Sequence, residues 1–106
     1  MNRGDLYLAD LGHPVGYEAG QRRPVLLMSA TNFHQYRMSV VLPITRTRRG
    51  YPSHVEIDGV LPQTSYVQCE QPRTISTERL IKYLGPIDRI DILKVEHALK
   101  QVLALN

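Results

Sequence analysis

The chain has 106 residues, of which 42% are hydrophobic and 22% charged, and its formal net charge is +3. A chain of this length and composition is expected to form one globular domain over residues 1–106 rather than a disordered segment. It contains no apolar run near the ~18 residues that span a bilayer and no signal-peptide pattern after Met1, so we expect no membrane contact and a cytoplasmic location. With Cys69 as the single cysteine, neither an internal disulfide nor a cysteine zinc cluster can form.

The first half of the chain predicts three strands. Residues 5–10 are typical of a short strand, and residues 12–21, which hold three glycines and a proline, are typical of a loop. The apolar runs at 24–29 and 40–45 predict buried strands. Pro43 cannot donate a ladder hydrogen bond, which favours an edge or a bulge at that position.

The second half predicts further strands and a terminal helix. Residues 54–58 and 66–70 alternate in polarity, and a short strand resumes at 74–76 after Pro72. Thr77 is a candidate cap for a single helical turn through Leu80. Asp88 is a candidate N-cap for a helix to about Leu105. One face of this helix carries the apolar side chains of Ile92, Val95, Leu99, Val102 and Leu103.

Several short strands followed by one helix predict a mainly β fold with a C-terminal α-helix, built as a bent sheet or small barrel. His13, His34 and His97 have no partner at metal-ligand spacing, so we interpret them as surface or packing residues, and we expect no metal site. Cys69 is interpreted as a small core residue rather than a nucleophile.

Arginines without neighbouring acids characterise the middle of the chain. No acidic residue occurs between Glu18 and Glu56, and the basic residues of this segment are Arg22, Arg23, Arg37, Arg46, Arg48 and Arg49. Guanidinium groups bind phosphate oxygens in a bidentate manner, so the segment suits a polyanion. A solvated basic face without a ligand is an equally good interpretation of the charge alone.

Five sequence blocks cover nearly the whole chain. They are Arg3-Gly4-Asp5-Leu6-Tyr7 with Asp10-Leu11, Gly16-Tyr17-Glu18 with Arg23-Pro24-Val25, Pro43-Ile44-Thr45, Ser53-His54-Val55-Glu56-Ile57, and Cys69-Glu70-Gln71-Pro72-Arg73-Thr74-Ile75. Taken together and in this order, they resemble the MazF/PemK toxins of toxin–antitoxin systems, and the last block is the most distinctive.

The resemblance implies a small SH3-like barrel with a C-terminal helix, assembled as a two-fold homodimer. It implies cleavage of single-stranded RNA at short sequence motifs without metal or cofactor, and inhibition by a cognate antitoxin. RNA is expected in a groove at the dimer interface, flanked by residues 12–22.

Metal-free cleavage uses the ribose 2′-OH as the nucleophile and leaves a 2′,3′-cyclic phosphate and a 5′-OH. Such a site must bind the phosphoryl oxygens and assist proton transfer. By resemblance, Arg23 and Thr45 are the catalytic arginine and threonine. Glu18 and Glu70 are also assigned to the catalytic site with open roles, and the identity of the general base is left open, since His54 is an imidazole that titrates near neutral pH.

Further residues are assigned to RNA binding, and these are Tyr17, Arg22, Arg46, Arg48, Arg49, His54, Gln71 and Arg73. Single-stranded RNA is held by cations and aromatic faces, so Tyr17 and Tyr51 are stacking candidates, whereas for Phe33 we favour partial burial. For Gln71 and Arg73 an alternative stays open, in which they bond loop backbone instead. Tyr17 and Gln68 depart from the family pattern, because some relatives carry histidine and arginine there.

Two other functions are considered. A gyrase-binding toxin of the CcdB type shares the fold but depends on a C-terminal tryptophan, and this chain has no Trp. A non-catalytic RNA- or antitoxin-binding relative is disfavoured because Arg23 and Thr45 are both present. The sequence therefore predicts an endoribonuclease.

Overall fold

Seven strands, two 3-10 helices and one α-helix make up the chain in the computed structural model. It describes the backbone of residues 1–106 and every side chain except those of Asn32 and His34, so the interpretation of His34 lies outside the described side chains. The elements are β1 (Asp5–Asp10), β2 (Arg22–Leu27), η1 (Thr31–Tyr36), β3 (Met38–Thr45), β4 (His54–Ile57), β5 (Ser65–Gln68), β6 (Arg73–Ser76), η2 (Thr77–Arg79), β7 (Leu80–Pro86) and α1 (Arg89–Val102).

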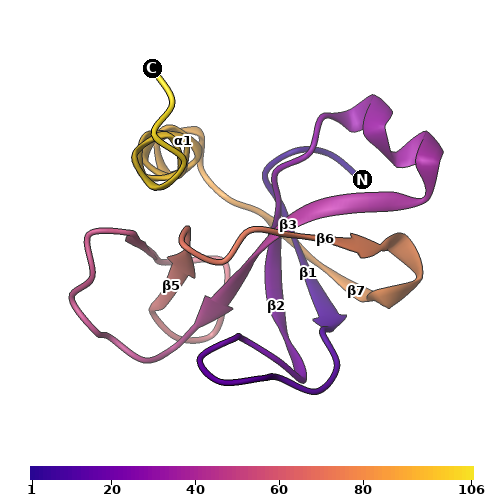
Figure 1. Ribbon diagram of the computed structural model, residues 1–106, viewed down its shortest axis with the longest axis horizontal. Coiled ribbons are helices and arrows are strands. Elements are labelled where there is room, and N and C mark those ends of the chain that lie inside the picture. Colours follow the sequence, from indigo (N-terminus) through magenta and orange to yellow (C-terminus); the bar gives the residue numbers. More distant parts are fainter.

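The strands form an antiparallel sheet in the order β4-β5-β3-β2-β1-β7, and β6 also pairs with β3. The long strand β3 has two partners on one side. Met38–Val41 pairs with β6, and Ile44–Thr45 pairs with β5. This change of partner bends the sheet, and α1 packs against β4, at the end of the sheet opposite β7 (Figure 1). The fold is therefore mainly β with one C-terminal helix, as predicted.

Both faces of the bent sheet carry an apolar core. In β2, Leu26 belongs to one cluster, together with Leu6 and Val67, while Val25 and Leu27 belong to the other. Successive side chains of a strand point to opposite faces, so a strand covered on both sides needs a continuous apolar run. This explains the run that predicts a buried strand at 24–29, although β2 begins two residues earlier, at Arg22.

Pro43 lies in a central strand and in an unbroken register with β2, so neither the expected sheet edge nor a bulge on that side is present. It pairs with Val25 of β2 and is fully buried. On the other side of β3, the residues up to Val41 pair with β6, and the residues from Ile44 onward pair with β5. A residue without an N–H is tolerated at this position because neither β5 nor β6 pairs with it.

Two elements were absent from the sequence expectations, namely η1 and β7. β7 is an edge strand that exposes Ile81 and Tyr83, so it lacks the buried alternation that identifies a strand. The helical turn after β6 is present, but its cap is Ser76 rather than Thr77. The Ser76 hydroxyl accepts a hydrogen bond from the Glu78 backbone N–H, 3.2 Å away.

The α1 helix begins after Asp88, as expected, but Asp88 makes no side-chain cap hydrogen bond. The helix ends at Val102 rather than near Leu105. Val95 and Ala98 are buried, whereas Val102 and Leu103 are 39% and 48% exposed, so the expected apolar face is covered along only part of its length. Within the described part of the chain, no helix has the length and hydropathy needed to cross a bilayer.

Candidate active site

The pairing of β2 with β3 brings Arg23 and Thr45 together. Val25 pairs with Pro43 at the end of the β2–β3 ladder, and Arg23 and Thr45 each lie two residues beyond this pair. Side chains two residues apart in a strand project to the same face of a sheet. Both residues line a hollow of about 440 Å³, here called the first hollow, which is lined by Arg22, Arg23, Pro24, Ile44, Thr45, Arg46, Thr47, Leu61, Pro62, Gln63 and Ser65.

The Arg23 guanidinium is half-buried and fixed at one nitrogen. Its Nε donates a hydrogen bond to the Gly20 carbonyl oxygen at 3.0 Å. Burial lowers the pKa of Arg23 from its ordinary value, and the nearby charge of Arg49 lowers it further. The group still carries its charge at neutral pH. An anion in the first hollow would relieve the repulsion between the two arginines.

Thr45 keeps its hydroxyl proton available for a ligand. Its Oγ1 accepts a hydrogen bond from the Thr47 backbone N–H at 3.1 Å, which occupies one lone pair. A hydroxyl has one proton to donate in addition to its lone pairs. The hydroxyl is therefore oriented by its acceptor side, and among the described side chains and backbone its proton has no acceptor, so it can be donated to an oxygen in the first hollow.

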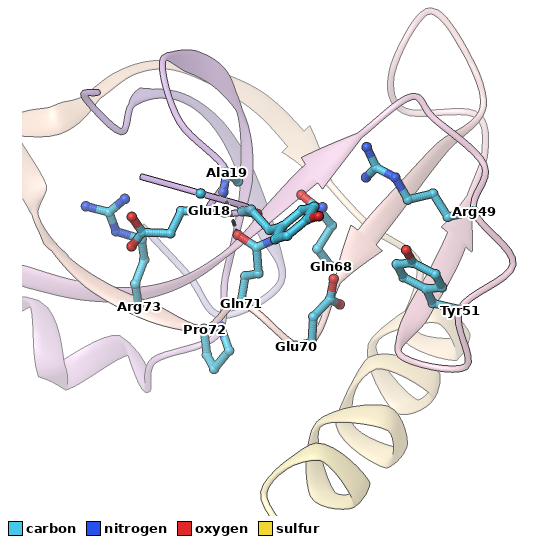
Figure 2. Close-up of a pocket in the computed structure, with 11 residues that line it drawn as sticks. Glu18, Ala19, Arg49, Tyr51, Gln68, Glu70, Gln71, Pro72 and Arg73 are labelled. Atoms are coloured by element: carbon cyan, nitrogen blue, oxygen red, sulfur yellow. Dashed lines mark hydrogen bonds between the residues drawn. The ribbon is translucent and has the colours of Figure 1, made fainter. Parts of the chain in front are cut away.

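A larger hollow of about 960 Å³, here called the second hollow, lies between the β1–β2 loop and the segment that carries Arg49 and Tyr51 (Figure 2). Its lining residues are Gly16, Tyr17, Glu18, Ala19, Arg49, Tyr51, Gln68, Glu70, Gln71, Pro72 and Arg73. The structure thus distributes the expected catalytic residues over two hollows, with Arg23 and Thr45 in the first and Glu18 and Glu70 in the second.

Two of the expected RNA-binding side chains hold the loop between β1 and β2. The Gln71 side chain accepts a hydrogen bond from the Ala19 N–H at 2.6 Å and donates one to the Tyr17 carbonyl at 3.1 Å. Arg73 donates to the Leu11 carbonyl at 3.3 Å. Gln71 and Arg73 therefore bond loop backbone, which is the alternative to RNA binding that the sequence left open. Both residues also line the second hollow.

The two expected carboxylates differ in their surroundings. Glu18 is exposed, and its Oε1 accepts a hydrogen bond from the Val15 N–H at 2.9 Å. Both oxygens of Glu70 accept hydrogen bonds, Oε1 from the Ser53 hydroxyl at 2.9 Å and Oε2 from His54 Nε2 at 2.8 Å. Glu70 is therefore held in one position, whereas Glu18 lies in a surface turn.

Hydrogen bonding stabilises the ionised form of Glu70. Burial raises the pKa of Glu70, but hydrogen bonds from His54, the Glu70 backbone and Ser53, together with the charge of His54, lower it below its ordinary value of 4.5. A carboxylate with a lowered pKa and both oxygens occupied is a poor proton acceptor. This environment argues against Glu70 as the general base.

His54 lies behind Glu70 rather than on the surface of a hollow. Its side chain is 2% exposed and lines neither hollow, and the Tyr51 ring packs edge-on against it with the ring centroids 5.0 Å apart. Its Nδ1 is buried and has no hydrogen-bond partner among the described residues. His54 therefore reaches the second hollow through Glu70, and its expected contact with RNA stays a prediction.

The basic residues after Thr45 are exposed. Arg46 lines the first hollow and donates a hydrogen bond to Gln63 Oε1 at 3.4 Å, and Arg49 lines the second. Arg48 lines neither hollow. Gln63 was missed by the sequence reasoning, because it lies in the loop between β4 and β5, which carries no motif. Cys69 is fully buried, as expected, and burial, with a smaller contribution from Glu70, raises its pKa to about 12.

Comparison with known proteins decides the family. A family model described as PemK-like, MazF-like toxin of type II toxin–antitoxin system matches residues 2–103. The chain belongs to this family. It is 32% identical to the endoribonuclease MazF of Staphylococcus epidermidis over 112 aligned positions, which cover 100% of this chain and 93% of that protein. It is 36% identical to the endoribonuclease EndoA of Bacillus subtilis (strain 168), with 99% and 96% covered.

Solved structures of family members share the fold. A mycobacterial endoribonuclease in complex with its cognate antitoxin superposes with a TM-score of 0.85 at 28% identity, covering 100% of this chain and 97% of that chain. The MazF of Deinococcus radiodurans superposes with a TM-score of 0.88, covering 99% and 97%; at 22% identity this second likeness concerns the fold alone. Tyr17 and Gln68, two positions where the expected resemblance to some relatives is incomplete, both line the second hollow.

The protonation of Glu70 makes stability depend on pH. Its pKa is lower in the folded chain than its ordinary 4.5, so the stabilisation is complete above that value and is lost as the pH falls through the folded pKa. We expect Glu70→Gln to lower the free energy of unfolding at pH 7 by about 1–3 kcal/mol, since hydrogen bonds to a charged group are lost. The deficit should shrink at pH 3, as measured by urea denaturation.

The control for this prediction is Glu56→Gln. Glu56 is an exposed carboxylate on β4, two residues from His54. The Glu56 variant should show a much smaller deficit at both pH values. A Glu70→Gln deficit of equal size at pH 7 and pH 3 would show that the charge of Glu70 contributes nothing.

Proposed function

We propose that the protein is the endoribonuclease toxin of a toxin–antitoxin pair and cleaves single-stranded RNA by attack of the ribose 2′-OH on the adjacent phosphate. The observation that carries the proposal is the convergence of Arg23 and Thr45 on the first hollow. A guanidinium and a hydroxyl donor on one face of a sheet are suited to the oxygens of a single phosphate. Family membership and the names of the relatives, both endoribonucleases, support this choice over gyrase binding.

In this proposal Arg23 and Thr45 stabilise the transition state. Negative charge accumulates on the phosphoryl oxygens as the 2′-oxygen attacks, and fixed donors aimed at that charge lower the barrier. Arg23 is positioned by its bond to Gly20, and Thr45 by its bond from the Thr47 N–H. The RNA strand is cut when the 5′-oxygen of the next nucleotide leaves the phosphorus atom. One fragment then ends in a 2′,3′-cyclic phosphate, and the other begins with a 5′-OH once that oxygen is protonated.

The carboxylates take different roles. Glu18 is the better candidate to accept the 2′-OH proton, because it is exposed in a surface turn and no described side chain donates a hydrogen bond to it. Glu70 is a fixed anion of the second hollow and orients groups there. Arg22 and Arg46, both at the first hollow, bind phosphates on either side of the scissile one, and Arg48 and Arg49 extend this positive charge.

We also propose a homodimer that acts in the cytoplasm and is neutralised by a cognate antitoxin. The support for association is the exposure of large apolar side chains on β7 and on α1, because exposed apolar surface is often covered by a partner. They are Ile81 and Tyr83 on β7, Ile90, Leu93 and Val102 on α1, and Leu103 directly after it. The support for an antitoxin is the family itself and the mycobacterial relative solved with its own antitoxin.

The test is cleavage of a random-sequence single-stranded RNA pool by the purified protein in EDTA. We expect fragments that end in a 2′,3′-cyclic phosphate and begin with a 5′-OH, identified by selective ligation and sequencing. A substrate with 2′-deoxyribose at the cut position should resist cleavage, because the nucleophile is missing. Cleavage of that substrate, or 5′-phosphate ends, would contradict the mechanism, and no cleavage would favour a binding function.

A further inference from the structure

One polar side chain of the second hollow carries a hydrogen-bond acceptor that has no partner among the described residues. Gln68, the last residue of β5, lines this hollow although it is only 3% exposed. Its carbonyl oxygen Oε1 is buried and accepts no hydrogen bond from any described residue. Buried amides normally have their hydrogen bonds satisfied, so an unpartnered one beside a cavity indicates a ligand that completes them.

The other glutamine of the hollow shows the contrast. Gln71 uses both ends of its amide to hold the loop between β1 and β2, through Ala19 and Tyr17. The side chain of Gln71 therefore stabilises the loop. Gln68 has an equal capacity for hydrogen bonds and a place in the same hollow, but its acceptor is unoccupied. Of the two, Gln68 is the side chain with an acceptor to offer a bound molecule.

The groups around Gln68 suit a nucleobase. In Figure 2, Gln68 lies between Gln71 on one side and Arg49 and Tyr51 on the other. Tyr17 is fully exposed and Tyr51 is half-exposed, so both present aromatic surface to the hollow. Unstacked bases of single-stranded RNA are bound by aromatic faces and guanidinium planes and are distinguished by hydrogen bonds to their edges.

We propose that Gln68 reads one nucleobase of the RNA substrate in the second hollow; this rests on the proposed ribonuclease function. The unoccupied Oε1 requires a donor, and the amide NH₂ beside it can donate. On the Watson–Crick edge, the bases with an exocyclic amino group next to an acceptor nitrogen are adenine and cytosine, and these match this pair, as in the bidentate glutamine–adenine contact. Uracil lacks the amino group and is disfavoured.

The base read by Gln68 belongs to a nucleotide near the scissile bond. Arg49 lines the second hollow and is close enough to Arg23 to lower its pKa, and Arg23 lines the first. Gly20, which accepts the hydrogen bond from Arg23, directly follows Ala19 of the second hollow. One RNA strand can therefore place a phosphate in the first hollow and a neighbouring base in the second.

The experiment compares the cut motif of the wild type with that of Gln68→Met, which keeps the length of the side chain and removes both hydrogen-bonding groups. The matched control is Gln101→Met, an exposed glutamine on α1. In a random single-stranded RNA pool, wild type and control should prefer adenine or cytosine at one motif position by about tenfold or more. Gln68→Met should lose this preference at that position and keep the others.

An unchanged motif in Gln68→Met, or equal weakening of every motif position, would overturn the proposal. If thermal melting shows that Gln68→Met does not fold, Gln68→Glu replaces it. Glutamate keeps the acceptor and loses the donor, so the preference must change at the same single position.

A measurement of RNA binding tests base reading by Gln68 separately from the ribonuclease proposal. If the wild type cuts nothing, the ribonuclease proposal fails, and fluorescence anisotropy with short RNAs of adenine, cytosine or uracil tests base reading alone. Wild type should then bind the adenine or cytosine RNA more tightly than the uracil RNA, and Gln68→Met should bind them equally. Equal binding of all three by the wild type would overturn base reading by Gln68.

Discussion

Replacing Arg23 with alanine is expected to reduce single-turnover RNA cleavage by at least about 100-fold, because one fixed donor to the developing phosphoryl charge is typically worth 10²–10³ in rate. The fold should survive. Arg23 is half-buried at the start of β2, and within the described part of the chain its side chain makes one hydrogen bond, to the Gly20 carbonyl. A loss of about 1 kcal/mol in the free energy of unfolding is expected for such a contact.

A lysine at the same position separates charge from geometry. Arg23→Lys keeps the positive charge but not the planar fork that binds two phosphoryl oxygens, so we expect most of the activity to be lost here too. The control is Arg89→Ala, which removes an exposed arginine at the first position of α1. Rates are measured with protein in excess over a short fluorescent RNA. Undiminished cleavage by both Arg23 variants would remove Arg23 from the site.

The sequence predicted best the strands whose residues follow a simple pattern. β4 alternates in burial, and β2 ends in a buried apolar run at 25–27, whose side chains belong to the apolar clusters on both faces of the sheet. β7 has neither pattern, since it is an edge strand with exposed Ile81 and Tyr83. The position of Pro43 depends on which strands flank β3, and strand order is a property of the whole sheet rather than of local sequence.

The residues of the candidate active site were predicted in a different way from the strands. Arg23 and Thr45 were assigned by family resemblance, since an arginine before a proline and a threonine at a strand end carry no local signal of catalysis. Their common place in the first hollow follows from the β2–β3 register. The bonds from Gln71 to the loop join residues more than 50 positions apart, so no local pattern could reveal them.

Burial changed the roles of other candidates. His54 and Glu70 were separate expectations, and the structure joins them in one hydrogen-bonded pair with the imidazole inside. Gln68 stood out in the sequence as a departure from the family pattern, but its significance comes from a buried, unpartnered oxygen at the edge of a cavity. Whether a buried polar side chain finds hydrogen-bond partners depends on three-dimensional packing, which sequence periodicity does not determine.

Thr45→Val is expected to lower the single-turnover rate by about 100-fold while leaving RNA binding nearly unchanged. Valine has the shape of threonine without the hydroxyl, so the loss reports the donated hydrogen bond. Removing the oxygen also frees the Thr47 N–H, which is exposed and can bond to water instead. Thr45→Ser, which keeps the donor, should retain much of the activity, and Thr74→Val, at an exposed position on β6, should cut normally.

The double variant Arg23→Ala/Thr45→Val tests whether the two side chains act on the same phosphate. Donors to one group depend on each other's positioning, so removing the second after the first should cost less than removing it from the wild type. We therefore expect a combined loss smaller than the product of the single losses. A combined loss equal to that product would indicate independent roles. Binding of an RNA with 2′-deoxyribose at the cut position, measured for all four proteins, separates lost affinity from lost chemistry.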